Sequence, residues 1–315
     1  MSPHKPVDTE ARADVIAGGL RSSAGGRRVR PVAPRPYDAL SRRAARSRCT
    51  ILLTGETGVG KGHFARWIHE HSQRAGKAFI PVNCGAIPES LVDSQLFGHA
   101  RGAFSGASTE HAGLVRAAEG GTLFLDEVAE LPPSAQSRLL RLLQEREVQP
   151  VGVARPVRVD VRVVAATNLD LQEAVSSGRF RTDLLFRLDV VRIVVPPLRT
   201  RRAEIDPLIE AFNAEFADLY DQSPLEITPE AKDALVAHEW PGNIRQLRTV
   251  FERLHVLCPG ERITITHLRE LGQLTGVVTR RGAGESAATA GSPLDRVMLD
   301  EVERVLRQCD RSVTR

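Results

Sequence analysis

Cysteine is scarce in this chain of 315 residues. The cysteines lie far apart and form no C-x-x-C pair, so the sequence indicates neither a disulfide framework nor a zinc site. Cysteine usage of this kind fits a reducing cytoplasm. Aromatic residues are scarce as well, at 4% of the chain, which makes any aromatic outside an apolar pattern a candidate for a functional role. The four cysteines are Cys49, Cys84, Cys258 and Cys309.

Long apolar runs are also missing. No stretch approaches the ~18 residues that a membrane span needs, and the N-terminus has no apolar segment of the kind found in secretion signals. Both observations predict a cytoplasmic protein with no membrane partner. The remaining composition is that of a globular protein, with 42% hydrophobic and 26% charged residues.

Positive charge is concentrated at the N-terminal end. Residues 1–48 hold eleven Lys and Arg against four Asp and Glu, whereas the remainder has a net charge of −3. Residues 1–36 also contain five prolines and four glycines, so we predict a disordered basic arm there. Such an arm can touch nucleic acid, but a solvated tail is the simpler explanation.

Strand and helix patterns alternate through the first two thirds of the chain. This alternation indicates an α/β fold in which a parallel sheet is covered on both faces. We predict an α/β nucleotide-binding subdomain over residues 37–198 with a five-stranded sheet. The candidate strands are residues 50–54, 78–83, 122–127, 157–167 and 189–195.

Only helical patterns follow, and they predict a small helical lid domain over residues 199–274. Residues 275–292 are rich in Gly, Ala and Ser, which predicts a flexible linker. Ser292 and Pro293 form a helix start, so a single helix is expected within residues 293–315. The lid helices are expected near residues 202–220, 228–239, 243–257 and 264–273.

The stretch "GETGVGKG" follows the first strand and opens a helix. It has the G-x-x-x-x-G-K pattern of a loop whose backbone N–H groups wrap around phosphates. Lys61 is expected to reach the β- and γ-phosphates. Gly62 replaces the usual Ser or Thr, so a Mg²⁺ ion would depend more on water and on a carboxylate elsewhere. The predicted nucleotide-binding residues here are Gly55, Glu56, Thr57, Gly58, Val59, Gly60, Lys61 and Gly62.

Two further strands end in polar residues at the same predicted edge of the sheet. "GGTLFLDEV" ends in two acids: we expect Asp126 to hold Mg²⁺ through water and Glu127 to polarise an attacking water. The alternative is a pair of ordinary strand-end carboxylates. "VVAATN" places Thr167 or Asn168 where it could sense the γ-phosphate, although a strand followed by a turn residue explains this segment equally well.

These blocks, in this order, resemble the AAA+ ATPase domain of the bacterial sigma-54-dependent transcription activators. The resemblance runs from about Ser47 to Leu271. It implies a P-loop AAA+ fold that binds ATP and Mg²⁺, and an ATPase that remodels the closed promoter complex of sigma-54 RNA polymerase. The segments that carry it are "GETGVGKG", "FIPVNCGAIPESLVDSQLFGHARGAFSGA", "GGTLFLDEV", "VDVRVVAATNLDL", "FRTDLLFRLDVVRIVVPPLRTRRAEI" and "WPGNIRQLRTV".

The resemblance also implies roles for single residues. Asn83 matches a switch residue that pairs with the catalytic Glu127 and moves it as the nucleotide changes. Arg181 and Arg187 match arginine fingers that enter the site of a neighbouring subunit, typically in a hexameric ring. From spacing alone, surface ion pairing would be favoured for both arginines. Arg245 matches a second sensor that reaches the nucleotide from the lid.

A local pattern surrounds that second sensor. Asn243 is expected to cap a helix with Gln246 three residues on, as in a capping box. Arg245 would then lie in the first helical turn, where a cation is unfavourable for the helix dipole. This placement favours a functional reason for the arginine.

The stretch "GHARGAFSGA" holds an aromatic residue among Gly, Ala and Ser, without apolar periodicity. It resembles the family's Gly-Ala-Phe-Thr-Gly-Ala loop, with Ser in place of Thr. The resemblance implies that the loop contacts sigma-54, with glycines as hinges at both ends. The alternative is a disordered insertion. The predicted contact residues are Gly102, Ala103, Phe104, Ser105, Gly106 and Ala107.

The sequence also departs from the family outside this loop. The region "RVRPVAPRPYDAL" replaces a segment that helps to hold adenine. Residues 293–315 look like only the first helix of a helix-turn-helix, so enhancer DNA is an expected partner only if a complete module exists beyond Arg315. These departures leave open a nucleotide-binding oligomeric regulator that does not open promoters. A small-molecule kinase is a third alternative, but no acceptor-binding insertion is visible.

Overall fold

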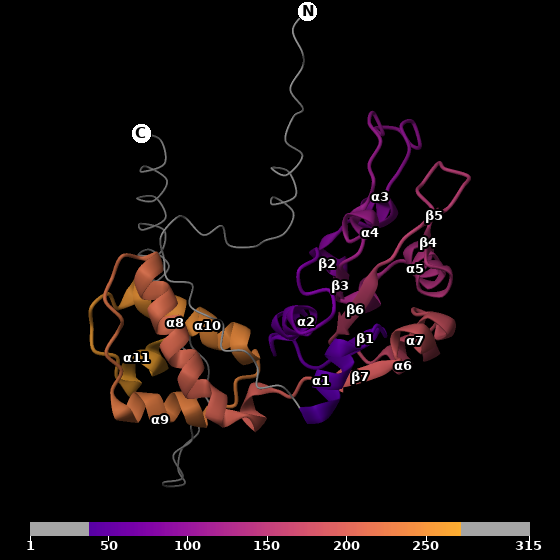
Figure 1. Ribbon diagram of the computed structural model, residues 1–315. Coiled ribbons are helices and arrows are strands. Elements are labelled where there is room, and N and C mark those ends of the chain that lie inside the picture. Colours follow the sequence, from indigo (N-terminus) through magenta and orange to yellow (C-terminus); the bar gives the residue numbers. More distant parts are fainter. Residues whose placement is uncertain (1–37, 272–315) are drawn as a thin grey trace, which may run out of the picture. The chain divides into compact units, whose positions relative to one another are not determined.

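The computed structural model describes residues 38–271 (Figure 1). The predicted arm over residues 1–36, the linker over 275–292 and the helix over 293–315 lie outside these residues. The elements below are those of the described part.

A five-stranded parallel sheet forms the centre of the first subdomain, as the sequence predicts. Its strand order is β2-β3-β6-β1-β7, and each neighbouring pair runs parallel. Thr54 pairs with Thr167, and Asn83 pairs with Asp126, so the polar ends of four strands gather at one edge. The strands are β1 (Ile51–Thr54), β2 (Phe79–Asn83), β3 (Thr122–Asp126), β6 (Arg162–Thr167) and β7 (Val191–Val194).

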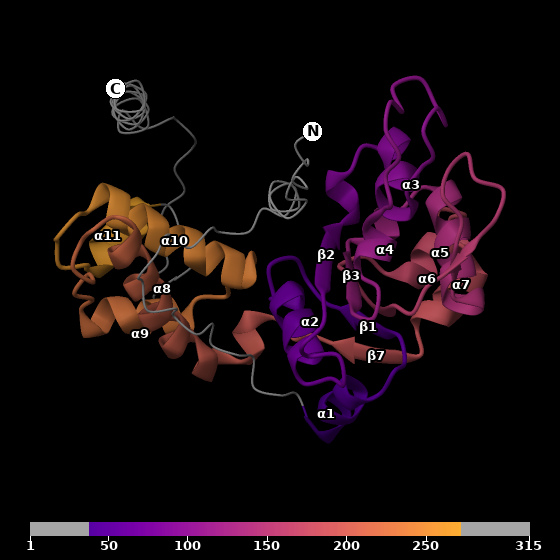
Figure 2. The same ribbon diagram turned by 45° about the horizontal axis from the view of Figure 1, so that its top comes forward.

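Hydrophobic cores lie on both faces of this sheet. Side chains alternate along a strand, so Ile51 and Leu53 enter one core while Leu52 enters the other. Helices α1 and α2 cover the first face and α3 to α7 the second; Figure 2 shows the sheet between α2 and α3. The helices are α1 (Asp38–Arg46), α2 (Lys61–Glu70), α3 (Glu89–Phe97), α4 (Leu114–Ala117), α5 (Pro133–Glu145), α6 (Leu171–Ser176) and α7 (Thr182–Leu188), with short 3₁₀ helices at η2 (Cys84–Ala86) and η3 (Val128–Glu130).

The predicted strand over residues 157–167 is interrupted, so that prediction is wrong. Its first part, β5 (Val157–Arg158), pairs antiparallel with β4 (Glu147–Val148) in a separate two-stranded sheet. Next, Val159 N donates to Arg146 O over 2.9 Å, and only then does β6 begin. The alternating valines suit either pairing, and an alternation of period two does not show where a chain changes its partner.

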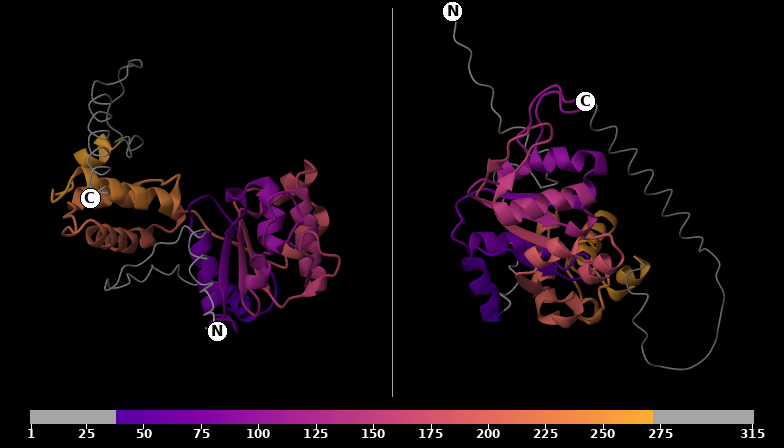
Figure 3. Two further views of the ribbon diagram at one scale, coloured as in Figure 1. Left: turned by 90° about the horizontal axis from the view of Figure 1, so that it is seen from above. Right: turned by 90° about the vertical axis from the view of Figure 1, so that its right-hand side faces the viewer.

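A separate hydrophobic core belongs to the lid. Phe216, Trp240 and Phe251 are buried at its centre, and Trp240 Nε1 donates to Leu235 O over 2.8 Å, which satisfies the polar atom of the buried ring. Figure 3 shows the lid helices as a group of their own. The elements are η4 (Leu198–Thr200), η5 (Arg202–Glu204), α8 (Ile205–Leu219), α9 (Pro229–Ala237), α10 (Asn243–Leu257) and α11 (Ile265–Glu270).

Arg162, the first residue of β6, holds α1 on the sheet. Its two terminal nitrogens each donate over 2.7 Å, to Ala45 O and to Ala44 O. These carbonyls lie in the last turn of α1, where a helix leaves its C=O groups without internal partners. Since Arg162 is only 3% exposed, no solvent can replace these hydrogen bonds.

We expect Arg162→Met to lower the free energy of unfolding by about 2 kcal/mol, because Ala45 O loses its side-chain donor and Ala44 O keeps only the N–H and hydroxyl of Ser47. Urea denaturation followed by circular dichroism measures the change. The control is Arg158→Met, whose side chain is 90% exposed and whose loss should change stability by less than about 0.5 kcal/mol. Equal stability of the two variants would contradict the role given to Arg162.

Candidate functional site

The predicted phosphate loop lies between β1 and α2. Lys61 begins α2 and is 8% exposed. Its Nζ donates to Gly55 O over 2.8 Å and to Glu56 O over 3.1 Å, so the ammonium group sits inside the curve of the loop. Burial lowers the pKa of Lys61, and the charges of Asp126 and Glu127 oppose this shift. The two acids therefore lie within electrostatic reach of the lysine.

Asp126 and Glu127 follow each other at the carboxyl end of β3. Asp126 Oδ1 accepts a hydrogen bond from Glu127 N over 3.0 Å. Glu127 has a φ of +55°, a left-handed conformation that is uncommon for this residue type. Both side chains are half-buried, so their remaining oxygens can still accept hydrogen bonds from a ligand or from water.

Asn83 is brought beside Glu127 without bonding to it. Asn83 Oδ1 accepts from Gly85 N over 3.0 Å, and a Cβ added to Gly85 would lie 2.6 Å from Glu127 Oε2. Gly85 therefore separates the two side chains, and within residues 38–271 no hydrogen bond joins them. The predicted pairing of Asn83 with Glu127 is not present in this structure, although the two residues are neighbours.

The strand-end acids fit a Mg²⁺ ion, which prefers oxygen ligands and keeps several waters. Asp126 offers a half-buried carboxylate at the mouth of the loop. Gly62 offers no hydroxyl, and a Cβ there would meet the Phe124 ring at 3.7 Å. A Mg²⁺ ion bound here would depend on this carboxylate and on waters, and this donor set stays a prediction.

Of the two residues proposed as γ-phosphate sensors, Asn168 reaches the phosphate loop. Its Nδ2 donates to Thr57 Oγ1 over 3.1 Å. Thr167 is buried, and its hydroxyl oxygen accepts from Leu169 N over 3.0 Å. The sequence leaves both residues open as sensors, and the hydrogen bond to Thr57 favours Asn168.

Asn243 does not cap its helix, which corrects the predicted capping box. The N-cap of α10 is Gly242, and Gln246 Oε1 accepts from Gly242 N over 2.9 Å. Asn243 is fully buried with a φ of +52°. Its Nδ2 donates to Glu56 Oε2 and to Thr57 O, each over 3.0 Å. The asparagine therefore bonds the phosphate loop instead of its own helix.

Glu56 is the centre of a polar cluster that the sequence analysis missed. Arg199 donates to its two carboxylate oxygens over 2.5 Å and 2.9 Å. Hydrogen bonds from Arg199, and then from Asn243, lower the pKa of Glu56 to about 2. The folded-state pKa lies below the ordinary value of 4.5, so this contribution to stability is present above pH 4.5 and is lost as the pH falls toward 2.

Arg245 is exposed beside the same loop. A Cβ added to Gly58 would lie 3.1 Å from Arg245 Cβ and 2.4 Å from Gly242 O. Gly58 also has a φ of +78°, so only glycine fits this close approach. The start of α10 therefore packs directly on the phosphate loop, which places Arg245 next to the predicted nucleotide site.

Arg181 is the N-cap residue of α7 and Arg187 lies on this helix. Neither makes a hydrogen bond to the phosphate loop of its own chain within the described residues. Arg181 forms an exposed ion pair with Asp183, with Nη2–Oδ2 and Nε–Oδ1 distances of 2.8 Å and 3.0 Å. Arg187 is exposed, with no ion pair among residues 38–271. Ion pairing, the alternative that spacing favours, thus describes Arg181 but not Arg187.

The loop between α3 and α4 leaves the fold through a narrow neck (Figure 1). His99 N donates to His111 O over 2.9 Å, and His111 N donates to His99 O over 3.0 Å. Gly98 and Gly113 allow this approach, because a Cβ on Gly113 would lie 2.4 Å from Gly98 N. The base of the loop is therefore held by backbone hydrogen bonds.

Phe104 lies in this loop and is 40% exposed. Its ring packs only on the His99 ring, with centroids 5.0 Å apart, among the ring contacts of the described chain. Gly102 and Gly106 have φ values of +81° and +107°, as hinge glycines can have. The aromatic side chain that the sequence singled out is thus outside the hydrophobic cores.

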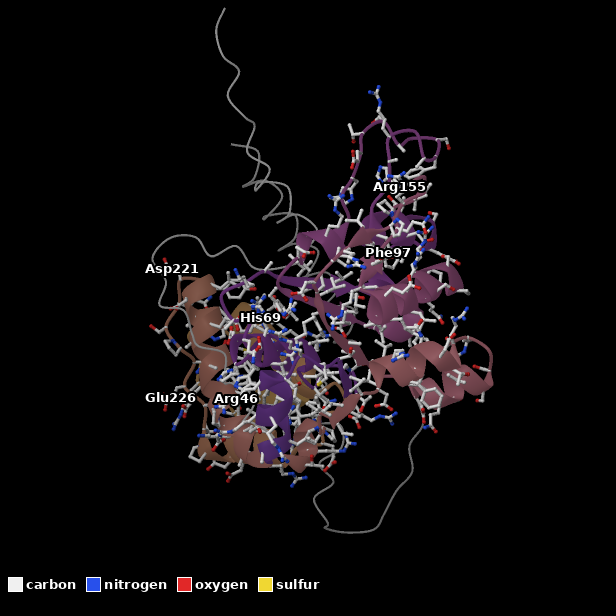
Figure 4. All side chains as sticks on the ribbon, turned by 45° about the vertical axis from the view of Figure 1, so that its right-hand side comes forward. Arg46, His69, Phe97, Arg155, Asp221 and Glu226 are labelled. Carbon is white, nitrogen blue, oxygen red and sulfur yellow. The ribbon has the colours of Figure 1, made fainter. Side chains whose placement is uncertain are left out.

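A second loop supports the first. It joins β4 to β5, and Val151 O accepts from Ala100 N over 2.9 Å. A Cβ on Gly152 would lie 2.8 Å from Ala103 Cβ, so the two loops touch. Figure 4 shows Arg155 on the second loop and Phe97 at the base of the first.

One cluster of metal-ligating residue types occurs in the described part of the lid. It comprises Cys258, Glu261 and His267, whose ligand atoms all lie within 4.8 Å of one another. His267 Nδ1 accepts from Thr264 N over 3.1 Å, so Nε2 carries the proton that it shares with Glu261. Burial also raises the pKa of Cys258. Both effects oppose metal ligation, and we assign no metal to the cluster.

Comparisons with known proteins identify the family. Residues 35–194 match the model of the sigma-54 interaction domain, and residues 199–276 match that of the AAA+ ATPase lid domain. The chain belongs to the sigma-54 interaction domain family. The AAA+ fold with a helical lid, expected from the sequence, is thereby confirmed.

Relatives of this sigma-54 interaction domain are bacterial transcriptional regulators. The chain is 42% identical over 294 residues to the alginate biosynthesis transcriptional regulatory protein AlgB of Pseudomonas putida, covering 93% of this chain and 63% of AlgB. It is 49% identical over 226 residues to the phenol regulator MopR of Acinetobacter guillouiae, covering 72% of this chain and 40% of MopR. The chain therefore spans less than two thirds of the length of these relatives.

A solved structure resembles the sigma-54 interaction domain closely. NtrX from Brucella abortus in complex with ATP has a TM-score of 0.65 and 38% identity, covering 72% of this chain and 52% of NtrX. In the part of the chain that the structure describes, no helix is both long and apolar enough to cross a membrane.

We expect Gly58→Ala to weaken ADP binding about tenfold or more, a loss of roughly 1.4 kcal/mol. The added Cβ would lie 2.4 Å from Gly242 O and push the lid off the phosphate loop. Isothermal titration calorimetry measures the affinity. Gly62→Ala is the matched control, because its Cβ makes only an ordinary contact at 3.7 Å. Wild-type affinity in both variants would show that this close packing is not needed.

Proposed function

We propose that this chain is an ATPase that activates transcription by remodelling sigma-54 RNA polymerase. The observation that carries the proposal is the group of residues that gathers at one edge of the sheet. There Lys61, the Asp126–Glu127 pair and Asn168 surround the phosphate loop, and the chain continues from the neighbouring β2 through α3 to the exposed Phe104. A hydrolytic site and a loop able to touch a partner are thus joined within one stretch of chain.

In the proposed reaction, the backbone N–H groups of the loop and Lys61 bind the phosphates of ATP. Asp126 would hold Mg²⁺ through water, and the ion would neutralise charge on the phosphates. Glu127 accepts a hydrogen bond from a water molecule, which attacks the γ-phosphorus as the bond to the β-phosphate oxygen breaks. The proton of the water passes toward Glu127, and ADP and inorganic phosphate leave.

The proposed site is completed by a second copy of the chain. Arg181, at the N-cap of α7, and Arg187, on this helix, are exposed and form no hydrogen bond to their own phosphate loop within the described residues. A neighbouring subunit could therefore receive them as arginine fingers, which stabilise the charge on the transferring phosphoryl group. A closed ring, typically of six subunits in the resembling family, would supply one pair of arginines to each site.

The proposed coupling runs along the chain that follows β2. Asn83 ends β2 beside Glu127, then η2 and α3 follow, and α3 ends at the neck of the loop. A shift of Glu127 upon loss of the γ-phosphate would alter the surroundings of Asn83 and Gly85. Because α3 is packed in the core, it would transmit this shift to Phe104 and to sigma-54. Contact with enhancer DNA would require a complete helix-turn-helix.

We expect the purified chain to turn over Mg²⁺-ATP with a specific activity that rises with protein concentration. Glu127→Gln should retain ATP binding while turnover falls by about 10²–10⁴-fold, the usual contribution of a general base. A phosphate-release assay measures the rate. If Glu127→Gln changed neither turnover nor transcription, the alternative function would be favoured, a nucleotide-binding regulator that does not open promoters. The absent hydroxyl at Gly62 is one observation that motivates this alternative.

We expect Phe104→Ala to abolish nucleotide-dependent capture of sigma-54, with a loss of about 2 kcal/mol or more, while ATP turnover persists. Capture is measured by pull-down with an ATP analogue. Val157→Ala is the control, since Val157 is exposed to a similar degree, at 38% against 40% for Phe104. Ser105→Thr, which restores the residue of the resembling family, should retain capture. If Phe104→Ala still captured sigma-54 in the pull-down, the proposed coupling role of the loop would be wrong.

A further inference from the structure

Three successive carbonyls of the phosphate loop are bonded by the lid. Thr57 O accepts from Asn243 Nδ2 over 3.0 Å, and Gly58 O accepts from Ile244 N over 3.0 Å. Val59 O accepts from Arg201 Nη2 over 2.6 Å. All three donors follow β7 in the chain, so none belongs to the sheet that carries the loop.

These bonds also determine where the loop's N–H groups point. In a planar trans peptide, the C=O of one residue and the N–H of the next point in opposite directions. Holding the carbonyls of residues 57, 58 and 59 therefore directs the N–H groups of Gly58, Val59 and Gly60 to the other side. Within residues 38–271 these three N–H groups donate to no protein atom, which leaves them available for phosphate oxygens.

The loop itself is not rigid enough to supply this order. Gly58 and Gly60 have φ values of +78° and +97°, and glycine loses more conformational freedom on ordering than any other residue. Without outside partners the peptide units could rotate, and binding phosphate would then have to order them. The lid donors remove this freedom before any ligand arrives.

Asn243 is oriented for this task by its own contacts. Leu198 N donates to its Oδ1 over 2.8 Å, which fixes the amide with Nδ2 toward the loop. The two amide protons are then used on Glu56 Oε2 and Thr57 O. Glu56 in turn is held by Arg199, and Arg201 by Glu204 at 3.0 Å. The two side chains that donate to the loop, Asn243 and Arg201, are therefore each fixed by a second interaction.

We propose that Asn243 and Arg201, supported by the Glu56–Arg199 ion pair, are positioning residues that pre-order the phosphate loop for a nucleoside di- or triphosphate. They act through the loop backbone and do not touch the nucleotide, unlike the role proposed for Arg245. The inference rests on the proposed function only in that this loop binds nucleotide phosphates. On this proposal, any change that breaks the hydrogen bonds from the lid to the loop also lowers the affinity of the loop for phosphate.

The test uses Asn243→Asp in the full chain, with ADP and adenosine titrated separately by calorimetry. Asp keeps the size of the side chain, tolerates a positive φ and keeps an acceptor for Leu198 N, but replaces the donor facing Glu56 and Thr57. We expect the Kd for ADP to rise about 30-fold, a change of roughly 2 kcal/mol, and the Kd for adenosine to stay within twofold. Thr249→Ala, nearly two turns further along α10, is the control and should leave both affinities unchanged.

A second variant keeps the proposal falsifiable if Asn243→Asp disturbs the lid. Glu56→Gln added to Asn243→Asp removes the repulsion between two carboxylates but returns no donor to Thr57 O. We therefore expect only a partial recovery of ADP affinity, of about fivefold. Two outcomes would overturn the proposal: a Kd for ADP within twofold of wild type in Asn243→Asp, or a parallel loss of adenosine affinity. Because ADP binding is the readout, the result stands even if the chain neither hydrolyses ATP nor captures sigma-54.

Discussion

The parallel direction of the five strands is the constraint on which the rest of the site depends. Parallel strands place all their carboxyl ends at one edge, and here those ends are Thr54, Asn83, Asp126 and Thr167. Residues far apart in sequence therefore meet around a single loop without any dedicated contact between them. The sheet is buried on both faces by separate cores, so the edge is as rigid as the hydrophobic packing behind it.

The sheet alone leaves one part of the site undetermined. It fixes where the phosphate loop begins and ends, but the loop crosses from β1 to α2 through glycines that permit several peptide orientations. The lid limits that choice by bonding three consecutive carbonyls. Glu56 strengthens the connection, since hydrogen bonds from Arg199 and Asn243 lower its pKa to about 2 and keep the carboxylate ionised above that pH. Lid and sheet are thus joined at the atoms that nucleotide binding requires.

Much of this arrangement could be predicted from the sequence, because its signals are local. The phosphate loop is a contiguous motif, the five strands are contiguous β-rich runs, and Phe104 stands out against small neighbours. The cluster of Glu56, Arg199 and Asn243 could not be predicted, since Glu56 lies more than 140 residues from the other two and no local pattern links the three. Asn243 even presented a plausible but wrong local pattern, the capping box. The break between β5 and β6 was not predicted for a related reason, because the alternation of apolar and polar residues does not show which strand is the partner.

The loop that carries Phe104 shows how a rigid fold can hold an exposed aromatic ready for a partner. Its neck is closed by two hydrogen bonds between His99 and His111, so freedom is confined to the tip. Next to the neck, Ala100 N donates to Val151 O, which holds this loop against the loop between β4 and β5. In the proposed mechanism, a displacement of α3 would move the neck as a unit and change how the loop sits against its support. The stiff neck, together with Gly102 and Gly106, would then convert a small shift at the sheet edge into a changed presentation of Phe104.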